Sequence, residues 1–81
     1  MLQTIRTLIA EHGRLPVSVE TLANDQDLYA AGLTSFAAVQ LMLALEDAFD
    51  IEFPETMLNR RSFASIDAIA GCLAQLARAA A

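Results

Sequence analysis

The sequence is poor in the residues that build catalytic and metal sites. It has one cysteine, one histidine and neither lysine nor tryptophan among its 81 residues. Cys72 has no partner for a disulfide within the chain, and together with His12 it supplies too few ligands for a zinc site. The three glycines stand apart, so no Gly-rich phosphate loop is present. Catalytic mechanisms need convergent groups that this chain lacks, and we expect a protein that is not an enzyme.

Positive charge and long apolar runs are also scarce. Five arginines face ten acidic residues, which gives a net charge of −5 and a pI near 4.5. Nucleic-acid-binding domains usually carry a basic face, so we expect no nucleic-acid partner. Arg60 and Arg61 are expected to be solvated or paired with surface carboxylates, and a role in docking is the alternative. The chain has no apolar run of about 18 residues and no signal-peptide pattern at its start, which predicts a cytoplasmic protein without a membrane partner.

The apolar residues of the chain are sufficient for a helical core. The composition is 56% hydrophobic and 19% charged, which is typical of a folded domain. Because domains run about 50–250 residues, residues 1–81 predict a single domain. Three segments show helical periodicity, and a shorter stretch favours one turn. The expected helices are residues 2–12, residues 35–49, a short turn at 55–59, and a last helix from a cap at Ser65 to about Arg78.

A connection of about 20 residues joins the first two predicted helices, longer than the 2–8 residues usual in bundles. It begins after Gly13, the expected C′ residue of the first helix, and includes Pro16. Apolar residues recur along it, so we expect it to pack against the helices and to form a short turn. The predicted fold is therefore an all-α bundle of four helices, three longer and one short, with a long first loop. The expected anchors are Val17, Val19, Leu22, Leu28, Tyr29 and Leu33, with residues 24–27 as a polar tip.

The helix predicted at residues 35–49 has apolar side chains on two faces. At about 100° per residue, Phe36 and Leu43 fall on one stripe with Gln40 and Asp47, opposite the core-facing sector. Single exposed apolar residues are normal, but two large ones on one stripe favour contact with a partner. The core-facing sector is expected to hold Ala38, Leu41, Met42, Leu45 and Phe49.

The start of this helix has a capping signature. The run Gly32-Leu33-Thr34-Ser35-Phe36 leads directly from the long loop into the helix. Thr34 or Ser35 is the expected N-cap, which contributes about 1 kcal/mol. A serine at this position is also where an attached phosphate is well tolerated, because free N–H groups and the helix dipole favour an anion. The two interpretations are compatible.

These residues and those that follow them resemble a known protein family. The run Asp27–Phe36, followed by residues 39–54, resembles the acyl carrier and peptidyl carrier protein family over nearly the whole chain. In that family a serine in an Asp-Ser-Leu motif, closely preceded by glycine, receives 4′-phosphopantetheine, and Ser35 is the matching position. Residues 45–49 and Pro54 are similar to the family's Leu-Glu-x-x-Phe segment and the Pro-containing loop after it. The resemblance implies an acyl-carrier-like four-helix bundle.

Two positions depart from the family pattern, and neither removes the acceptor hydroxyl. Thr34 stands where Asp is usual, which removes a negative charge beside Ser35 and bears on which phosphopantetheinyl transferase accepts the protein. Phe36 stands where Leu or Met is usual, which enlarges the apolar contact beside the arm. Fatty-acid carriers have a strongly acidic second helix, whereas alanines lower the density of negative charge on the corresponding helix of this chain. Docking should therefore depend on shape and apolar contact, and its strength should respond weakly to salt. The expected docking residues are Leu33, Thr34, Phe36, Gln40, Leu43 and Asp47.

The cargo follows from a finer resemblance. Residues 38–45 and 53–69 are more similar to small discrete aminoacyl carriers than to fatty-acid carriers. This implies a thioester-bound aminoacyl group on 4′-phosphopantetheine at Ser35, a separate amino acid:carrier protein ligase and a downstream acceptor enzyme. Some ligases of this kind resemble truncated aminoacyl-tRNA synthetases. The alternatives are a fatty-acid or polyketide-type acyl carrier, a helical interaction module without prosthetic group, and a small acidic inhibitor. Replacing Ser35 with alanine would abolish carrier function but leave the last two nearly unaffected.

Overall fold

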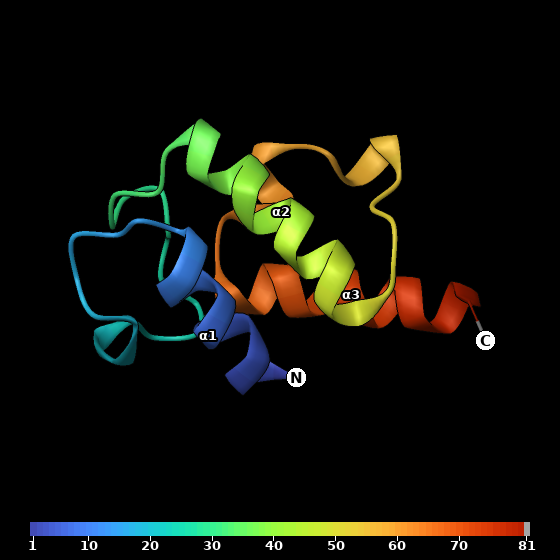
Figure 1. Ribbon diagram of the computed structural model, residues 1–81, viewed down its shortest axis with the longest axis horizontal. Helices are drawn as coiled ribbons and strands as arrows, with labels where there is room; N and C mark the ends of the chain where they lie inside the picture. Colours follow the sequence, from blue (N-terminus) through green and yellow to red (C-terminus); the bar gives the residue numbers. More distant parts are fainter. Residues whose placement is uncertain (81) are drawn as a thin grey trace.

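The computed structural model describes residues 1–80 and contains three α-helices joined by connections with short 3₁₀ helices (Figure 1). The helices expected at residues 2–12 and 35–49 are confirmed, as are the helix after Ser65 and a turn within residues 55–59. The all-α prediction is therefore confirmed, and one further turn, at residues 60–63, was not predicted. The elements are α1 (Leu2–His12), η1 (Val19–Thr21), α2 (Ser35–Phe49), η2 (Glu55–Met57), η3 (Arg60–Phe63) and α3 (Ile66–Ala80).

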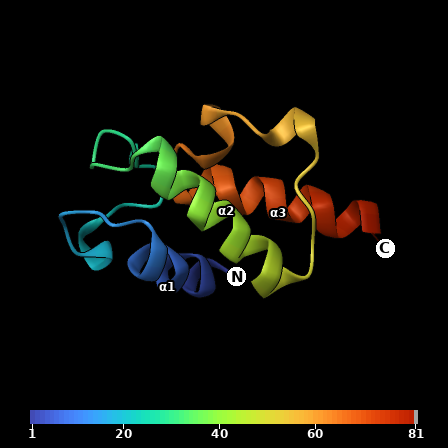
Figure 2. The ribbon, with the colours of Figure 1, turned by 45° about the horizontal axis from the view of Figure 1, so that its top comes forward.

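The core lies where the three long helices meet. Helix α1 packs against both α2 and α3, and α2 crosses α3 with the 51–65 connection on the side away from α1 (Figures 1 and 2). Each helix contributes aliphatic side chains at helical spacing, and their burial is the main source of stability. The most deeply buried of them are Ile5, Ile9, Leu41, Leu45, Ile66, Ile69 and Leu73.

Hydroxyl side chains begin both α2 and α3. Thr34 Oγ1 accepts a hydrogen bond from the Ala37 N–H at 3.0 Å, and Ser65 Oγ accepts one from the Ala68 N–H at 3.0 Å. Thr34 is thus the N-cap of α2, one of the two residues the sequence indicated, and the predicted cap at Ser65 is confirmed. The end of α1 differs from expectation. Gly13 is right-handed (φ −75°), and the left-handed residue is Arg14 (φ 54°).

Side-chain hydrogen bonds hold the long first connection in place. The Arg6 guanidinium donates to Val19 O at 2.8 Å, to Leu22 O at 2.9 Å and to Asn24 Oδ1 at 2.6 Å. One charged group of α1 thereby satisfies three acceptors of the connection. A hydrogen bond to a charged group is stronger than a neutral one, so Arg6 is a principal support of this segment.

The same connection is also joined to the start of α3. The Leu28 N–H donates to Ala64 O at 2.7 Å, and the Asp67 N–H donates to Asn24 O at 2.9 Å. Asn24 is therefore engaged on two sides, and it is not part of a solvated polar tip as the sequence suggested. The connection links α1 to α3 and delivers the chain to the first residue of α2.

Most of the expected anchors of the connection are confirmed. Tyr29 is half-buried, whereas Val17 is 46% exposed and the prediction that it packs inward is wrong. Val17 directly follows Pro16, which is itself exposed, in a bend that leads away from the helices. The anchors that do lie in the core are Val19, Leu22, Leu28 and Leu33.

Candidate functional site

Ser35 is the first residue of α2, and its side chain is exposed. The cap by Thr34 satisfies the Ala37 N–H. The N–H groups of Ser35 and Phe36 come earlier in the first turn, where no intrahelical acceptor exists. The exposed hydroxyl therefore lies beside backbone donors at the positive end of the helix dipole, which favours an anion at this position.

A tight loop places this helix start. Gly32 has φ +122°, and a Cβ at this residue would lie 2.7 Å from Cδ of Pro16. Only glycine combines that backbone conformation with so close an approach. Asp27 Oδ1 accepts from the N–H groups of Tyr29 at 2.9 Å and Ala30 at 3.4 Å, which fixes the turn before it. The loop thus sets Tyr29 and Ser35 on the same side of the molecule.

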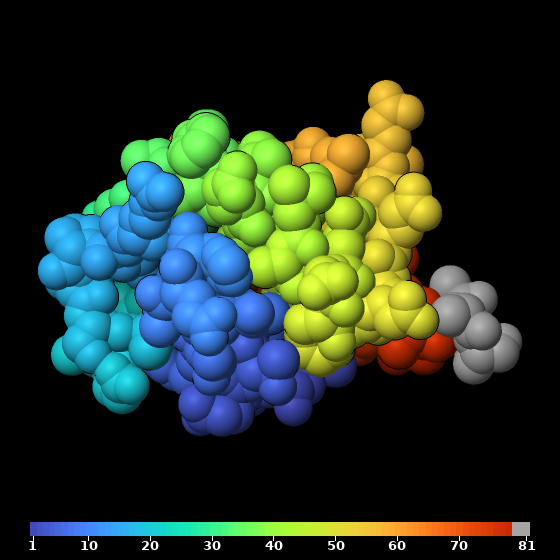
Figure 3. Space-filling model, in the orientation of Figure 1, coloured from blue at the N-terminus to red at the C-terminus, as the bar shows by residue number. Residues whose placement is uncertain are grey.

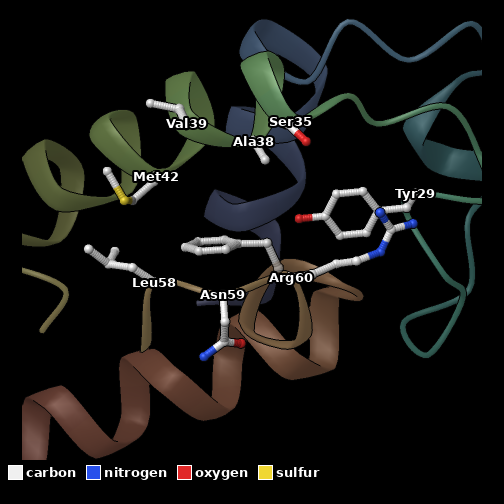
Figure 4. A pocket seen from close by; sticks show the side chains of 9 residues that line it. Tyr29, Ser35, Ala38, Val39, Met42, Leu58, Asn59 and Arg60 are labelled. Atoms are coloured by element: carbon white, nitrogen blue, oxygen red, sulfur yellow. The ribbon is translucent and has the colours of Figure 1, made fainter. Parts of the chain in front are cut away.

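An apolar groove of about 410 Å³ begins at Ser35 (Figure 4). One wall comes from α2 and the other from the segment that contains η3, with Tyr29 at one end. The groove has few polar groups, and Arg60 is the one lining residue with a charge. The remaining lining residues are Ala38, Val39, Met42, Leu58, Asn59 and Phe63.

Arg60 stacks on Tyr29 at this groove. Its guanidinium carbon lies 4.0 Å from the centre of the Tyr29 ring, a cation–π contact. Within residues 1–80, no carboxylate lies within 4.0 Å of Arg60, which is exposed, so of the two expected states the structure shows exposure to solvent and no ion pair. Partial burial raises the pKa of the Tyr29 hydroxyl, the Arg60 charge opposes that rise, and the nearby Asp27 charge adds to it.

Four of the expected docking residues, at positions 36, 40, 43 and 47, share one stripe of α2. Helix α2 is open at the surface of the molecule, in green to yellow in Figure 3. Phe36 is 63% exposed and Leu43 is 51% exposed, and the polar residues on this list, Thr34, Gln40 and Asp47, are exposed as well. For Leu33 the prediction of a docking role is wrong. Leu33 is 4% exposed and belongs to the core, because the turn at Gly32 directs its side chain inward.

The sequence analysis missed several residues of this region. Val39 is 50% exposed and lines the groove, and the Arg14 guanidinium carbon lies 5.9 Å from the centre of the Phe36 ring. The stack of Arg60 on Tyr29 had no visible signal, because the two residues are 31 positions apart in sequence. Val39 could have been found, since it lies four residues after Ser35 and therefore on the same face of the helix.

A membrane-spanning helix and a metal site are two features that the sequence disfavoured. No helix within residues 1–80 is long and apolar enough to cross a membrane. No three His, Cys, Asp or Glu side chains of the same residues gather as candidate metal ligands.

Comparison with protein families identifies the class. Residues 3–73 match the family described as "phosphopantetheine attachment site". This range covers most of the chain, and the chain belongs to this family. It is a carrier protein rather than a catalyst, and its prosthetic group is phosphopantetheine.

Individual relatives are more specific. The chain is 65% identical over 66 residues to an aminoacyl carrier protein of Agrobacterium fabrum, a match that covers 82% of this chain and 80% of that protein. It is similar to a crystal structure of an engineered Bradyrhizobium japonicum glycine:[carrier protein] ligase complexed with a carrier protein from Agrobacterium tumefaciens and AMP. That match has a TM-score of 0.90 and 59% identity, and it covers 91% of this chain and 99% of the other. A solution structure from Agrobacterium tumefaciens matches over 100% of both chains, with a TM-score of 0.78 and 55% identity.

Proposed function

We propose that Ser35 carries the 4′-phosphopantetheine arm, attached through its Oγ as a phosphodiester. The observation that carries the proposal is an exposed hydroxyl at the start of α2, beside backbone N–H groups that have no intrahelical acceptor. Such a helix start stabilises a phosphate. The groove of about 410 Å³ that begins at Ser35 offers an apolar surface to the pantetheine portion. The residues present therefore fit the group.

We further infer that the cargo is an aminoacyl group and that a glycine:[carrier protein] ligase loads it. The support is the 65% identity to an aminoacyl carrier protein and the 59% identity to a chain in a structure of that ligase with its carrier. When bound, the arm supplies a thiol that holds the aminoacyl group as a thioester. A phosphopantetheinyl transferase adds the arm, and an acceptor enzyme takes the aminoacyl group, in the cytoplasm. The chain itself anchors the arm and presents surfaces to these enzymes.

The exposed surface of α2 formed by Thr34, Phe36, Gln40, Leu43 and Asp47 is the proposed docking surface. Its two large apolar side chains, Phe36 and Leu43, are more than half exposed and lie about two turns apart on one helix stripe, which favours contact with a partner. The polar members surround them as the polar rim of an interface does. A carrier must pass between enzymes, so this contact should be small and quickly released.

The first experiment measures intact mass before and after incubation with coenzyme A and a broad-specificity phosphopantetheinyl transferase. We expect the wild type and Thr34→Ala to gain one phosphopantetheine and Ser35→Ala to gain none. Thr34→Ala is the matched control, because it alters the neighbouring hydroxyl and leaves Ser35 in place. A mass gain in Ser35→Ala would place the attachment elsewhere.

The second experiment measures loading of the holo protein by a glycine:[carrier protein] ligase. Phe36→Glu and Leu43→Glu are each expected to raise the KM for the carrier about tenfold, the cost of losing an apolar contact of an interface. Val17→Glu is the control, since it replaces a comparably exposed apolar residue outside α2. An unchanged KM in both α2 variants would contradict the docking surface, and loading of fatty acids in preference to glycine would contradict the aminoacyl cargo.

A further inference from the structure

A positive charge lines the same groove as the proposed attachment residue, in a chain of net negative charge. Ser35 belongs to α2 and Arg60 to η3, and both line the groove (Figure 4). The chain has a net charge of −5, yet among the described residues that line this groove the single charged one is a cation. The groove therefore joins an apolar surface to one site that attracts an anion.

Arg60 is held in position without using its hydrogen-bond donors on the described chain. The stack on Tyr29, at 4.0 Å, fixes the plane of the guanidinium and leaves the N–H groups at its edge free to donate. Within residues 1–80 no carboxylate lies within 4.0 Å of Arg60. The carboxylate of Asp27, whose charge reaches Tyr29, accepts instead from the N–H groups of Tyr29 and Ala30.

We propose that Arg60, braced by Tyr29, binds the phosphodiester of the arm on Ser35 and directs the arm along the groove. This inference rests on the proposed attachment at Ser35. A phosphodiester has one negative charge and two unesterified oxygens, which suit the fork of a guanidinium better than a single point charge. The N–H groups at the start of α2 and the guanidinium of Arg60 then approach the phosphate from the two walls of the groove. Arg60 is a positioning residue, because it acts on the anchor of the arm and not on the cargo.

The test compares Arg60→Gln with Arg61→Gln. Arg61 is the matched control, because it is the next residue of η3, is exposed, and lines a different hollow with Cys72 and Gln75 of α3. Both variants remove one positive charge. Each is converted completely to the holo form by coenzyme A and a transferase, with intact mass as the check, so that the rate of modification does not enter. The readouts are the phosphorus NMR resonance of the diester and the difference in melting temperature between holo and apo forms.

We expect the phosphorus resonance of Arg60→Gln to move away from the wild-type position and that of Arg61→Gln to coincide with it. Added salt should move the wild-type resonance toward that of Arg60→Gln, because it screens a charge pair that is partly exposed. Attachment of the arm should raise the melting temperature of the wild type and of Arg61→Gln by about 3 °C, and that of Arg60→Gln by less than about 1 °C.

The outcomes separate this inference from the proposed function. A wild-type protein that gains no mass at Ser35 overturns both. A modified Arg60→Gln protein whose resonance and melting increment equal those of the wild type overturns the role of Arg60 alone. Equal changes in Arg60→Gln and Arg61→Gln would also overturn it, since they would indicate a general effect of net charge.

Discussion

The starts of α2 and α3 use the same capping chemistry and serve different purposes. Each begins with a hydroxyl side chain that accepts a hydrogen bond at 3.0 Å from an N–H of its first turn. The first residue of α2 is the exposed Ser35, whereas the first residue of α3 is Ile66, which is 0% exposed. The Asp67 N–H near the start of α3 donates to Asn24 O. A capped helix start is therefore not a site by itself; it becomes one where its first residue and its free N–H groups face a groove.

The largest expected effect is on the free energy of unfolding when Ile66, the first residue of α3, is replaced with alanine. The same replacement at Ser35, the first residue of α2, is the comparison. Ile66→Ala should lower the free energy of unfolding by about 3 kcal/mol, because it leaves a cavity in the core. Ser35→Ala should change it by less than about 0.5 kcal/mol, since the side chain is exposed and is not the cap. Urea unfolding followed by circular dichroism measures both.

Ile66→Val is the control with a smaller cavity, and we expect it to lower the free energy of unfolding by about 1 kcal/mol. A loss in Ser35→Ala as large as that in Ile66→Ala would show that Ser35 has a structural role, and the contrast between the two helix starts would then be wrong.

A smaller effect is expected at the support of the first connection. Arg6→Met keeps the aliphatic part of the side chain and removes its hydrogen bonds to Val19 O, Leu22 O and Asn24 Oδ1. We expect a loss of about 2 kcal/mol in the free energy of unfolding, because partly buried acceptors lose a charged donor. Amide hydrogen exchange at Asp67, whose N–H donates to Asn24, should quicken more than exchange in α2. Uniform quickening across the molecule would argue against this local link.

The two caps should contribute nearly equally to stability and unequally to function. Thr34→Ala and Ser65→Ala should each cost about 1 kcal/mol in the free energy of unfolding. Thermal melting measures this as a decrease of about 4–8 °C in each variant. Ser65→Ala should be modified by the transferase at the wild-type rate, whereas Thr34→Ala, next to the proposed attachment residue, should be modified more slowly. Equal modification rates in Thr34→Ala and Ser65→Ala would contradict a functional difference between the two helix starts.

The smallest expected effect is a pH dependence at Tyr29. Burial raises the pKa of its hydroxyl, so the folded state retains the proton at a pH where the unfolded chain has lost it. Stability should be unaffected by Tyr29 below about pH 10 and should fall as pH rises from there toward the higher pKa of the folded state. Arg60→Gln should raise that pKa further, because the Arg60 charge opposes the rise.

The near-ultraviolet absorbance of tyrosinate measures this pKa directly. Tyr29 is the only tyrosine in the chain and tryptophan is absent, so the titration has a single source. Arg61→Gln should leave the pKa of Tyr29 unchanged. A Tyr29 pKa that does not respond to Arg60→Gln would contradict the stack between these two side chains.

The long helices and the position of Ser35 could be read from the sequence. Periodicity located α1 and α2, and the hydroxyl run at residues 34–35 located the start of α2. The short helix η3 could not be predicted, because Asn59, whose side chain accepts from the Ser62 N–H, caps only one turn and no apolar repeat develops. Val17 was misjudged as an anchor, and Leu33, correctly expected as an anchor, was misjudged as a docking residue, since the direction of a loop side chain depends on backbone turns that periodicity does not encode.

The sequence by itself determined the all-α fold and the hydroxyl residues at a helix start, because both are local in the chain, and its motifs over residues 27–54 were enough to indicate a phosphopantetheine-carrying family. Helical spacing and capping involve residues at most four positions apart. Only the tertiary structure decided the groove, since it brings residue 29, α2 and residues 58–63 together. The same holds for the stack of Arg60 on Tyr29 and for the support of the first connection by Arg6. These contacts join residues distant in sequence, and packing of the core is what brings them into reach.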